Sequence, residues 1–108
     1  MQARFVAPGM TIPHTPTAAL AAGEVVVQDQ LVGVTTHPVE ANQLCGLTVQ
    51  GVFDFAKATG GSIAVGALVY WNNTTKVATT TATGNTLIGK CIRAASNTDT
   101  TVRVLLTP

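Results

Sequence analysis

The stretch that decides the fold is Glu24-Val-Val-Val-Gln-Asp-Gln-Leu-Val-Gly-Val34, in which two short apolar runs flank a polar centre. Branching at Cβ disfavours the helix and fits the pleated sheet, so each valine-rich run predicts a strand. The Gln28-Asp29-Gln30 segment between the runs has the composition of a turn. The stretch therefore predicts a β-hairpin.

The same design returns later in the chain. Ala22-Gly23-Glu24-Val25-Val26-Val27 is matched in outline by Val65-Gly66-Ala67-Leu68-Val69-Tyr70, and a polar turn, Asn72-Asn73-Thr74, follows the second copy as well. We expect Gly23 and Gly66 to supply a positive φ or a close backbone approach. A smaller recurrence, Gly33-Val34, Gly51-Val52 and Gly89-Lys90, places a glycine within or entering an apolar strand. Short strands at these intervals predict a compact barrel or clip, and not a βαβ unit.

Further elements follow from local patterns. The alternation of residues 47–55 predicts one half-buried strand with a bulge at Gly51, and its core candidates are Leu47, Val49, Val52 and Phe55. A Gly84-Asn85 turn leads into a strand over residues 86–92, and residues 101–106 predict a closing strand with Val102 and Val104 inward and Arg103 outward. Residues 18–22 predict a strand or a single turn, and residues 55–59 are the one weak helix candidate.

The first 16 residues differ in composition from the rest. They contain Pro8, Pro13 and Pro16, which exclude a helix, and a Pro8-Gly9 turn signal. We expect an extended arm over residues 1–16 that becomes ordered on binding, and a single β-rich domain over residues 17–108.

Composition excludes several classes of function. Only 10% of the 108 residues are charged, against about 25% in an ordinary domain, and the formal net charge is +1. Because the six Lys and Arg residues are scattered and aromatic residues are few, we expect no nucleic-acid partner. No apolar run reaches the length of a signal peptide or a membrane span, so we expect synthesis in the cytoplasm and no membrane partner. A domain this small has a thin margin of stability, which favours self-association.

Candidate catalytic and ligand sites are weak. Gly84-Asn-Thr-Leu-Ile-Gly-Lys-Cys91 has the spacing of a phosphate-binding loop, but Cys91 replaces the Ser or Thr that would bind magnesium and no helix is predicted after it. The spacings of His14 and His37 from Cys45 and Cys91 match no zinc pattern, and the two cysteines are expected to be buried thiols. We expect no catalytic residue, no cofactor and no metal, and therefore no enzyme.

The chain as a whole resembles the capsid cement, or head decoration, proteins encoded in phage and prophage head gene clusters. The resemblance is carried in order by the following segments: Phe5-Val-Ala-Pro-Gly9, Ala21-Ala-Gly-Glu-Val-Val-Val27, Leu31-Val-Gly-Val34, Gly51-Val-Phe53, Ala64-Val-Gly-Ala-Leu-Val-Tyr-Trp71, Ala82-Thr-Gly-Asn-Thr-Leu-Ile-Gly89 and Val102-Arg-Val-Leu-Leu106. It implies an all-β fold, a compact single-domain β-clip or β-tulip-like barrel. It also implies a homotrimer bound to the major capsid protein on the outside of an icosahedral head.

This resemblance leads to a hypothesis for mechanism and contacts. The trimer would bind the expanded shell and not the compact precursor, and so stabilise the mature state. Composition makes the arm the candidate capsid contact, through Phe5, Val6, Pro8, Ile12 and Pro13. For Tyr70 and Trp71 two interpretations stay open, packing in the core and contact between copies in the trimer.

Two other functions remain as alternatives. The Gly84–Lys90 fragment suggests a nucleotide-binding or recombinase-like accessory protein. The many Thr and Asn side chains suggest a carbohydrate- or receptor-binding fragment of a head fibre, for which Trp71 and Tyr70 would have to form an exposed aromatic platform.

Overall fold

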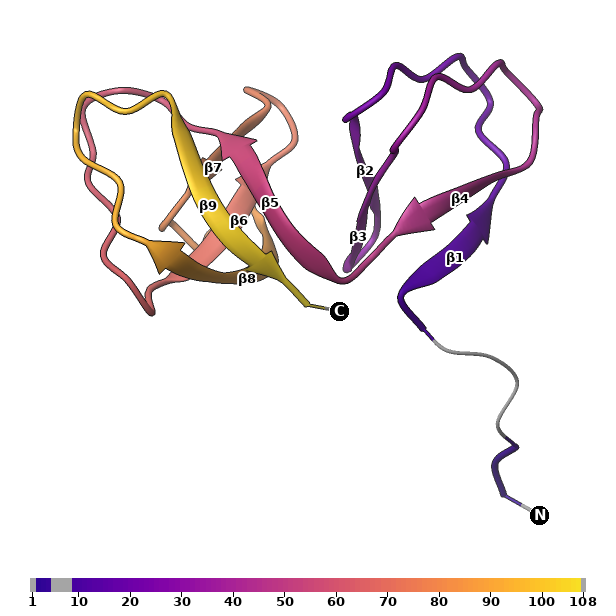
Figure 1. The fold of residues 1–108 in the computed structure, drawn as a ribbon, viewed down its shortest axis with the longest axis horizontal. Helices are drawn as coiled ribbons and strands as arrows, with labels where there is room; N and C mark the ends of the chain where they lie inside the picture. The colour runs from indigo at the N-terminus through magenta and orange to yellow at the C-terminus, as the bar shows by residue number, and fades with distance from the viewer. Residues whose placement is uncertain (1, 5–8, 108) are drawn as a thin grey trace.

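The computed structural model describes residues 2–4 and 9–107, and every regular element in them is a β-strand (Figure 1). The nine strands are β1 (Thr11–His14), β2 (Val25–Gln28), β3 (Leu31–Val34), β4 (Cys45–Thr48), β5 (Gly51–Ala56), β6 (Leu68–Asn72), β7 (Val77–Thr79), β8 (Thr86–Arg93) and β9 (Thr101–Leu106). They form two antiparallel sheets that lie side by side. The predicted all-β class is confirmed.

Residues 9–50, here called the N-terminal lobe, form a four-stranded sheet in the order β1-β4-β3-β2. The predicted hairpin is present, because β2 pairs with β3 in a register that sets Gln28 opposite Leu31. Asp29 in its turn has a positive φ of 56°. The side chains of His14 in β1 and Gln28 in β2 approach to 2.8 Å between Nδ1 and Nε2, so the two edge strands of this sheet meet.

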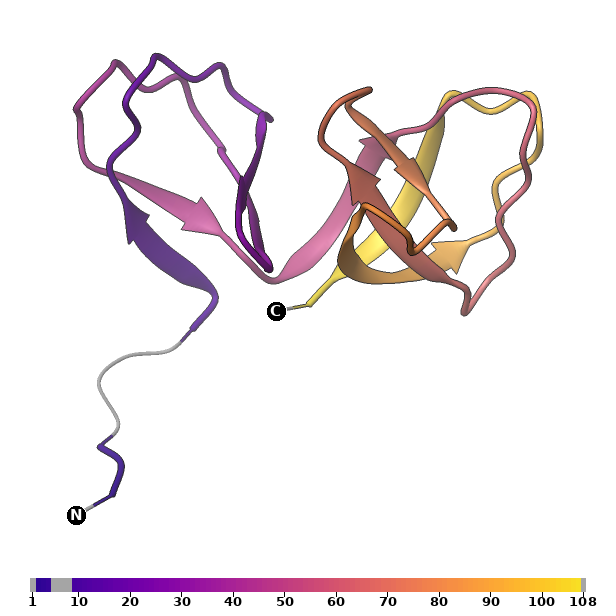
Figure 2. The same cartoon turned by 180° about the vertical axis from the view of Figure 1, so that it is seen from behind.

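Residues 51–107, the C-terminal lobe, form a five-stranded sheet in the order β5-β9-β8-β6-β7 (Figure 2). An isolated parallel bridge joins Lys57, just after β5, to Ala78 in β7. The two edges of the sheet therefore approach each other at one end. Across residues 9–107 the strands form no closed barrel, and the expected clip or barrel-like fold takes the form of two curled antiparallel sheets.

One hydrophobic core joins the two lobes. Val32 and Val34 of β3 belong to the same buried cluster as the inward side chains of the C-terminal sheet. Within that cluster Phe55 and Trp71 make an edge-on aromatic contact with ring centroids 5.8 Å apart. The hairpin of the first sheet thus covers the open side of the second, and the chain folds as a compact unit.

The glycines that precede β2 and β6 have the conformation expected of them. Gly23 has a φ of 75° and Gly66 a φ of 86°, which residues with a Cβ seldom adopt. The prediction from the internal repeat is confirmed at both positions, and the strands predicted over residues 86–92 and 101–106 are also present.

The single strand predicted over residues 47–55 is wrong. The chain leaves the first sheet after Thr48 and enters the second at Gly51, so two strands of different sheets meet in this segment. The change of sheet also resets which side chains face inward. Val52, an expected core residue, is 54% exposed, and Phe53 packs against the core in its place.

Two further expectations concern short segments. The helix considered over residues 55–59 is absent, because β5 continues through Ala56 and Lys57 then bridges to β7. Residues 18–22 form neither a full strand nor only a turn. Leu20 makes a single antiparallel bridge to Val39, and a turn at Ala22 and Gly23 follows.

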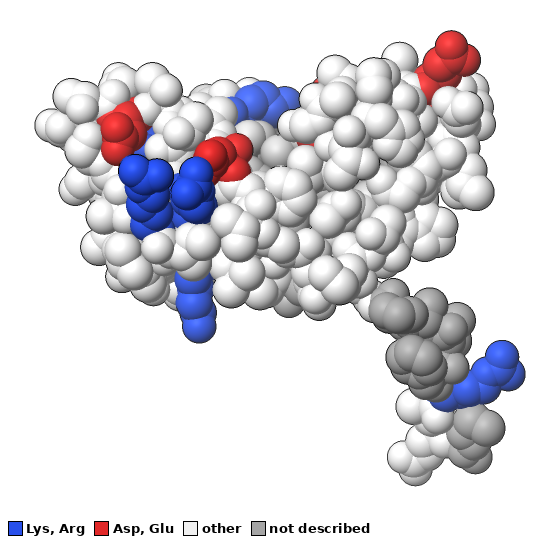
Figure 3. Space-filling model, in the orientation of Figure 1, with Lys and Arg blue, Asp and Glu red and all other residues white. Residues whose placement is uncertain are grey.

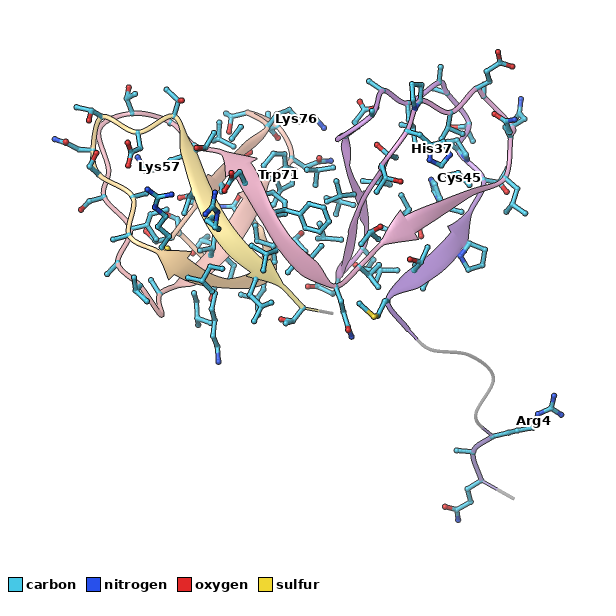
Figure 4. All side chains as sticks on the ribbon, in the orientation of Figure 1. Arg4, His37, Cys45, Lys57, Trp71 and Lys76 are labelled. Atoms are coloured by element: carbon cyan, nitrogen blue, oxygen red, sulfur yellow. The ribbon has the colours of Figure 1, made fainter. Side chains whose placement is uncertain are left out.

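The expected arm over residues 1–16 includes an ordered strand. Residues 11–14 form β1, which pairs with β4 at the edge of the N-terminal sheet. An edge position suits Pro13, which has no amide proton to donate to a second neighbour. Arg4 precedes it on a segment that points away from both lobes in Figure 4. The division between an arm and a domain at residue 16 stays a prediction.

Candidate functional site

Two of the five candidate capsid contacts of the arm lie in a strand that the structure describes. Ile12 and Pro13 lie in β1, opposite Leu47 and Gly46 of β4, with Ile12 partly buried and Pro13 exposed. Phe5, Val6 and Pro8 lie outside the described residues. Pro13 is therefore available for contact at the edge of the sheet. Ile12 is only partly available, because part of its side chain is buried in the N-terminal lobe.

Tyr70 and Trp71 have different surroundings. Trp71 is 4% exposed, packs against Phe55 and donates from its indole Nε1 to Asn73 Oδ1 at 3.3 Å. Figure 4 places it in the C-terminal lobe, close to β5. Tyr70 alternates with two buried neighbours in β6 and is partly exposed on the outer face of the sheet. Burial of Trp71 removes the aromatic platform that a carbohydrate site would need.

A cleft lies where the two lobes meet. Its volume is about 380 Å³, and its walls come from Val25 and Val34 on one side and from Phe53, Phe55 and Trp71 on the other. Glu24, Asp54 and Lys76 are the charged residues that line it. This lining offers apolar contact with a charged rim, and its described residues include no Ser, Cys or His that could serve as a nucleophile or a base.

The fragment that resembles a phosphate-binding loop is a turn and a strand. Gly84 has a φ of 76° in the turn, and residues 86–93 form β8, with no helix at their end to bind an anion. Cys91 is buried, and its thiol donates to the carbonyl of Arg93 at 3.0 Å. The geometry thus removes the motif that favoured a nucleotide-binding protein.

The side chains with metal-ligating potential lie apart. His37 and Cys45 are in the N-terminal lobe (Figure 4), and Cys91 is in the C-terminal lobe. Among the described residues no three His, Cys, Asp or Glu side chains gather into a possible metal site. Both cysteines are free and buried, as predicted. Within residues 2–4 and 9–107 there is no helix with the length and apolar character needed to span a membrane.

An ion pair lies on the outer face of the C-terminal sheet. Arg103 in β9 donates to both carboxylate oxygens of Asp54 in β5, from Nε at 3.0 Å and from Nη2 at 3.2 Å. The hydrogen bond from Arg103 lowers the pKa of Asp54 below its usual value, with smaller contributions from the charges of Arg103 and Arg93. Because both groups are exposed, the pair organises the surface more than it stabilises the fold.

Lys57 is a buried cation that sequence reasoning missed. Its side chain is 6% exposed, and Nζ donates to the carbonyls of Ala58, Ser96 and Asp99 at 3.0, 3.1 and 3.4 Å. It ties the loop after β5 to the loop before β9, at the end of the lobe where the sheet edges approach (Figure 4). A lone lysine between two strand segments carried no sequence signal for this role.

A row of exposed side chains crosses the outer face of the same sheet. Register sets Val52 of β5 opposite Leu105 of β9, Leu105 opposite Lys90 of β8, and Lys90 opposite Leu68 of β6. The three apolar members are 41–54% exposed. The row, Val52–Leu105–Lys90–Leu68, was missed because Val52 was expected to face inward. The alternation of Phe53 with Phe55 was the signal that could have placed it.

Comparison with known proteins identifies the family. Neither the curated proteins nor the solved structures contain a match. The family described as phage cement protein matches residues 6–106, which include part of the expected arm and all nine strands. The protein therefore has a structural role in a phage capsid, and the chain belongs to the phage cement protein family.

Proposed function

We propose that this protein binds the outer surface of a phage capsid as a homotrimer and stabilises the expanded shell. The observation that carries the proposal is the extent of the family match, which runs from residue 6 to residue 106 without leaving out either lobe. The partner is the major capsid protein, and the location is the surface of the virion.

The surface chemistry supports broad and weak contacts. The chain has few charges and many threonines, and eight large apolar side chains are exposed among the described residues. A trimer presents each contact three times, so that the second and third contacts form at a high effective concentration. Modest contacts can then give firm attachment without a deep binding pocket.

The stabilising effect follows from preferential binding. A protein that binds the expanded shell and not the precursor shifts the equilibrium toward expansion by RT ln(1 + [L]/Kd), about 2.7 kcal/mol for each site at a hundredfold excess over Kd. Many sites on one shell add this effect. No change in the cement protein itself is required.

The arm is the proposed contact with the shell, through Phe5, Val6, Pro8, Ile12 and Pro13. The exposure of Pro13 in the edge strand β1 and the position of Arg4 away from both lobes support this assignment. A prolyl ring at a sheet edge offers apolar surface and blocks further strand pairing at that residue.

Cosedimentation with purified shells tests the proposal. Protein at a fixed concentration is mixed with expanded and with unexpanded shells of its phage, and we expect it in the pellet with expanded shells alone. Phe5→Ala and Pro13→Ala should each weaken binding, while Leu44→Ala, in an exposed loop, is the matched control. Absence from both pellets would refute the capsid function, and undiminished binding of both arm variants would refute the role of the arm.

A further inference from the structure

The two lobes carry opposite charge, although the whole chain is nearly neutral. The N-terminal lobe contains three carboxylates, Glu24, Asp29 and Glu40, and no Lys or Arg, which gives a formal charge of −3. The C-terminal lobe contains five Lys and Arg residues and two aspartates, which gives +3. Within the two lobes, Figure 3 shows the Lys and Arg side chains, in blue, on the C-terminal lobe.

Three of the five Lys and Arg residues of the C-terminal lobe lie on the outer face of its sheet, and Asp54 on that face pairs with one of them. Arg93 in β8 lies opposite Arg103 in β9, and Lys90 lies on the same face of β8. Arg103 is already paired with Asp54. Within the described residues Arg93 makes no ion pair, and it lines a polar hollow of about 250 Å³ together with Arg103, Asp54 and Asp99.

The row Val52–Leu105–Lys90–Leu68 crosses this same face. It is about 15 Å long, because its four residues lie on adjacent strands about 4.8 Å apart. Leu87 and Ile92 of β8 extend the exposed apolar surface. Five of the eight large exposed apolar side chains among the described residues are thus on this face. That surface combines apolar contact with positive charge, as a protein interface does.

A cyclic trimer sets a requirement that this arrangement meets. Each contact in such a ring is heterologous, which means that two different patches of one chain must be complementary. Packing like lobes together would oppose charges of the same sign. Packing the basic face of one copy on the acidic lobe of the next sets opposite charges together.

We infer that copies of this chain associate head to tail, with the outer face of the C-terminal sheet packed on the N-terminal lobe of the next copy. The row Val52–Leu105–Lys90–Leu68 supplies apolar contact, and Arg93 receives a carboxylate of the neighbour in the polar hollow. Tyr70, on the outer face beside Leu87, lies at the border of this contact. The inference rests on the proposed trimer and names its two surfaces.

Charge swapping tests this arrangement in solution. Lys90→Glu with Arg93→Glu reverses the face, and Asp29→Lys with Glu40→Lys reverses the lobe. We expect each double variant to associate at least tenfold more weakly than the unmodified protein by light scattering, and a chain that carries all four changes to associate again, because its face and its lobe are then complementary at every contact of the ring. Leu105→Thr, which keeps a strand-forming residue, should also weaken association about tenfold. Lys76→Glu, in the β6–β7 turn, is the control for charge away from the face.

Salt and shell binding separate the outcomes. Association should weaken about tenfold between 0.05 and 0.5 M NaCl, because screening removes the contribution of the charges. Full association of the face variant, or no recovery in the chain that carries all four changes, would overturn the inference. Variants that stay trimeric but lose shell binding would assign this face to the capsid instead. Association as described without any shell binding would refute the proposed function and leave the inference standing. A thermal melt of each variant confirms that it is folded.

Discussion

Replacing Lys57 by methionine is the sharpest test of what holds the C-terminal lobe together. The change keeps most of the apolar stem and removes the ammonium group that donates to three carbonyls. A hydrogen bond from a charged donor contributes about 1.5–3 kcal/mol. The bond to Ala58 is local and the bond to Asp99 is long, so the bond to Ser96 sets most of the effect.

We expect Lys57→Met to lower the free energy of unfolding by about 2–4 kcal/mol. In a domain of this length that loss lowers Tm by about 10–20 °C. Thermal and urea unfolding followed by circular dichroism would measure both quantities. Lys76→Met is the matched control, because the side chain of Lys76 is exposed and its ammonium group donates, within the described chain, only to Asn73 Oδ1. This change should cost less than about 0.5 kcal/mol. Equal stability of the two variants would refute the structural role of Lys57.

Two further changes probe the packing and the surface. Gly33→Ala should lower the free energy of unfolding in urea by about 1–3 kcal/mol, because its Cβ would lie 2.9 Å from Leu47 Cβ. Gly9→Ala, with open space around it, should be neutral. Equal urea midpoints for the two variants would contradict this packing. The hydrogen bond from Arg103 lowers the pKa of Asp54. The ion pair therefore contributes to folding stability at pH values above the usual carboxyl pKa, and this contribution is lost as the pH falls through the lowered pKa. Asp54→Asn should therefore flatten slightly the acid-side loss of stability in urea midpoints below pH 4, and an unchanged pH profile would show that the pair has no effect on stability.

Local sequence patterns predicted the elements whose partners are close in the chain. The hairpin of β2 and β3, the glycine before each of two strands and the inward faces of Val102 and Val104 all follow from composition within a few residues. These features depend on φ preferences and on alternation, which are local properties.

The features that sequence reasoning missed depend on contacts between distant segments. Nothing local at Gly51 shows that the chain changes sheets there, and an assumed bulge turned Val52 inward. The proline-rich composition of the first segment hid β1, whose partner β4 lies more than thirty residues away. Lys57 reads as a surface residue until the loop that carries Ser96 is placed beside it. The exposed row on the C-terminal sheet was missed because Val52 was expected to face inward.

The position of the apolar row within the sheet bears on how the chain avoids indiscriminate aggregation. Val52 is on an edge strand and Leu68 pairs with Lys90 alone, but Leu105 and Lys90 at the centre of the row have strand partners on both sides, so their backbone groups are already paired. A partner can therefore reach the centre of the row only through side chains and cannot extend the sheet there. Lys90 interrupts the apolar surface at its centre and must be matched by a partner group. Contact at this face thus requires complementary charge as well as apolar surface, which favours one defined orientation between copies over open-ended association.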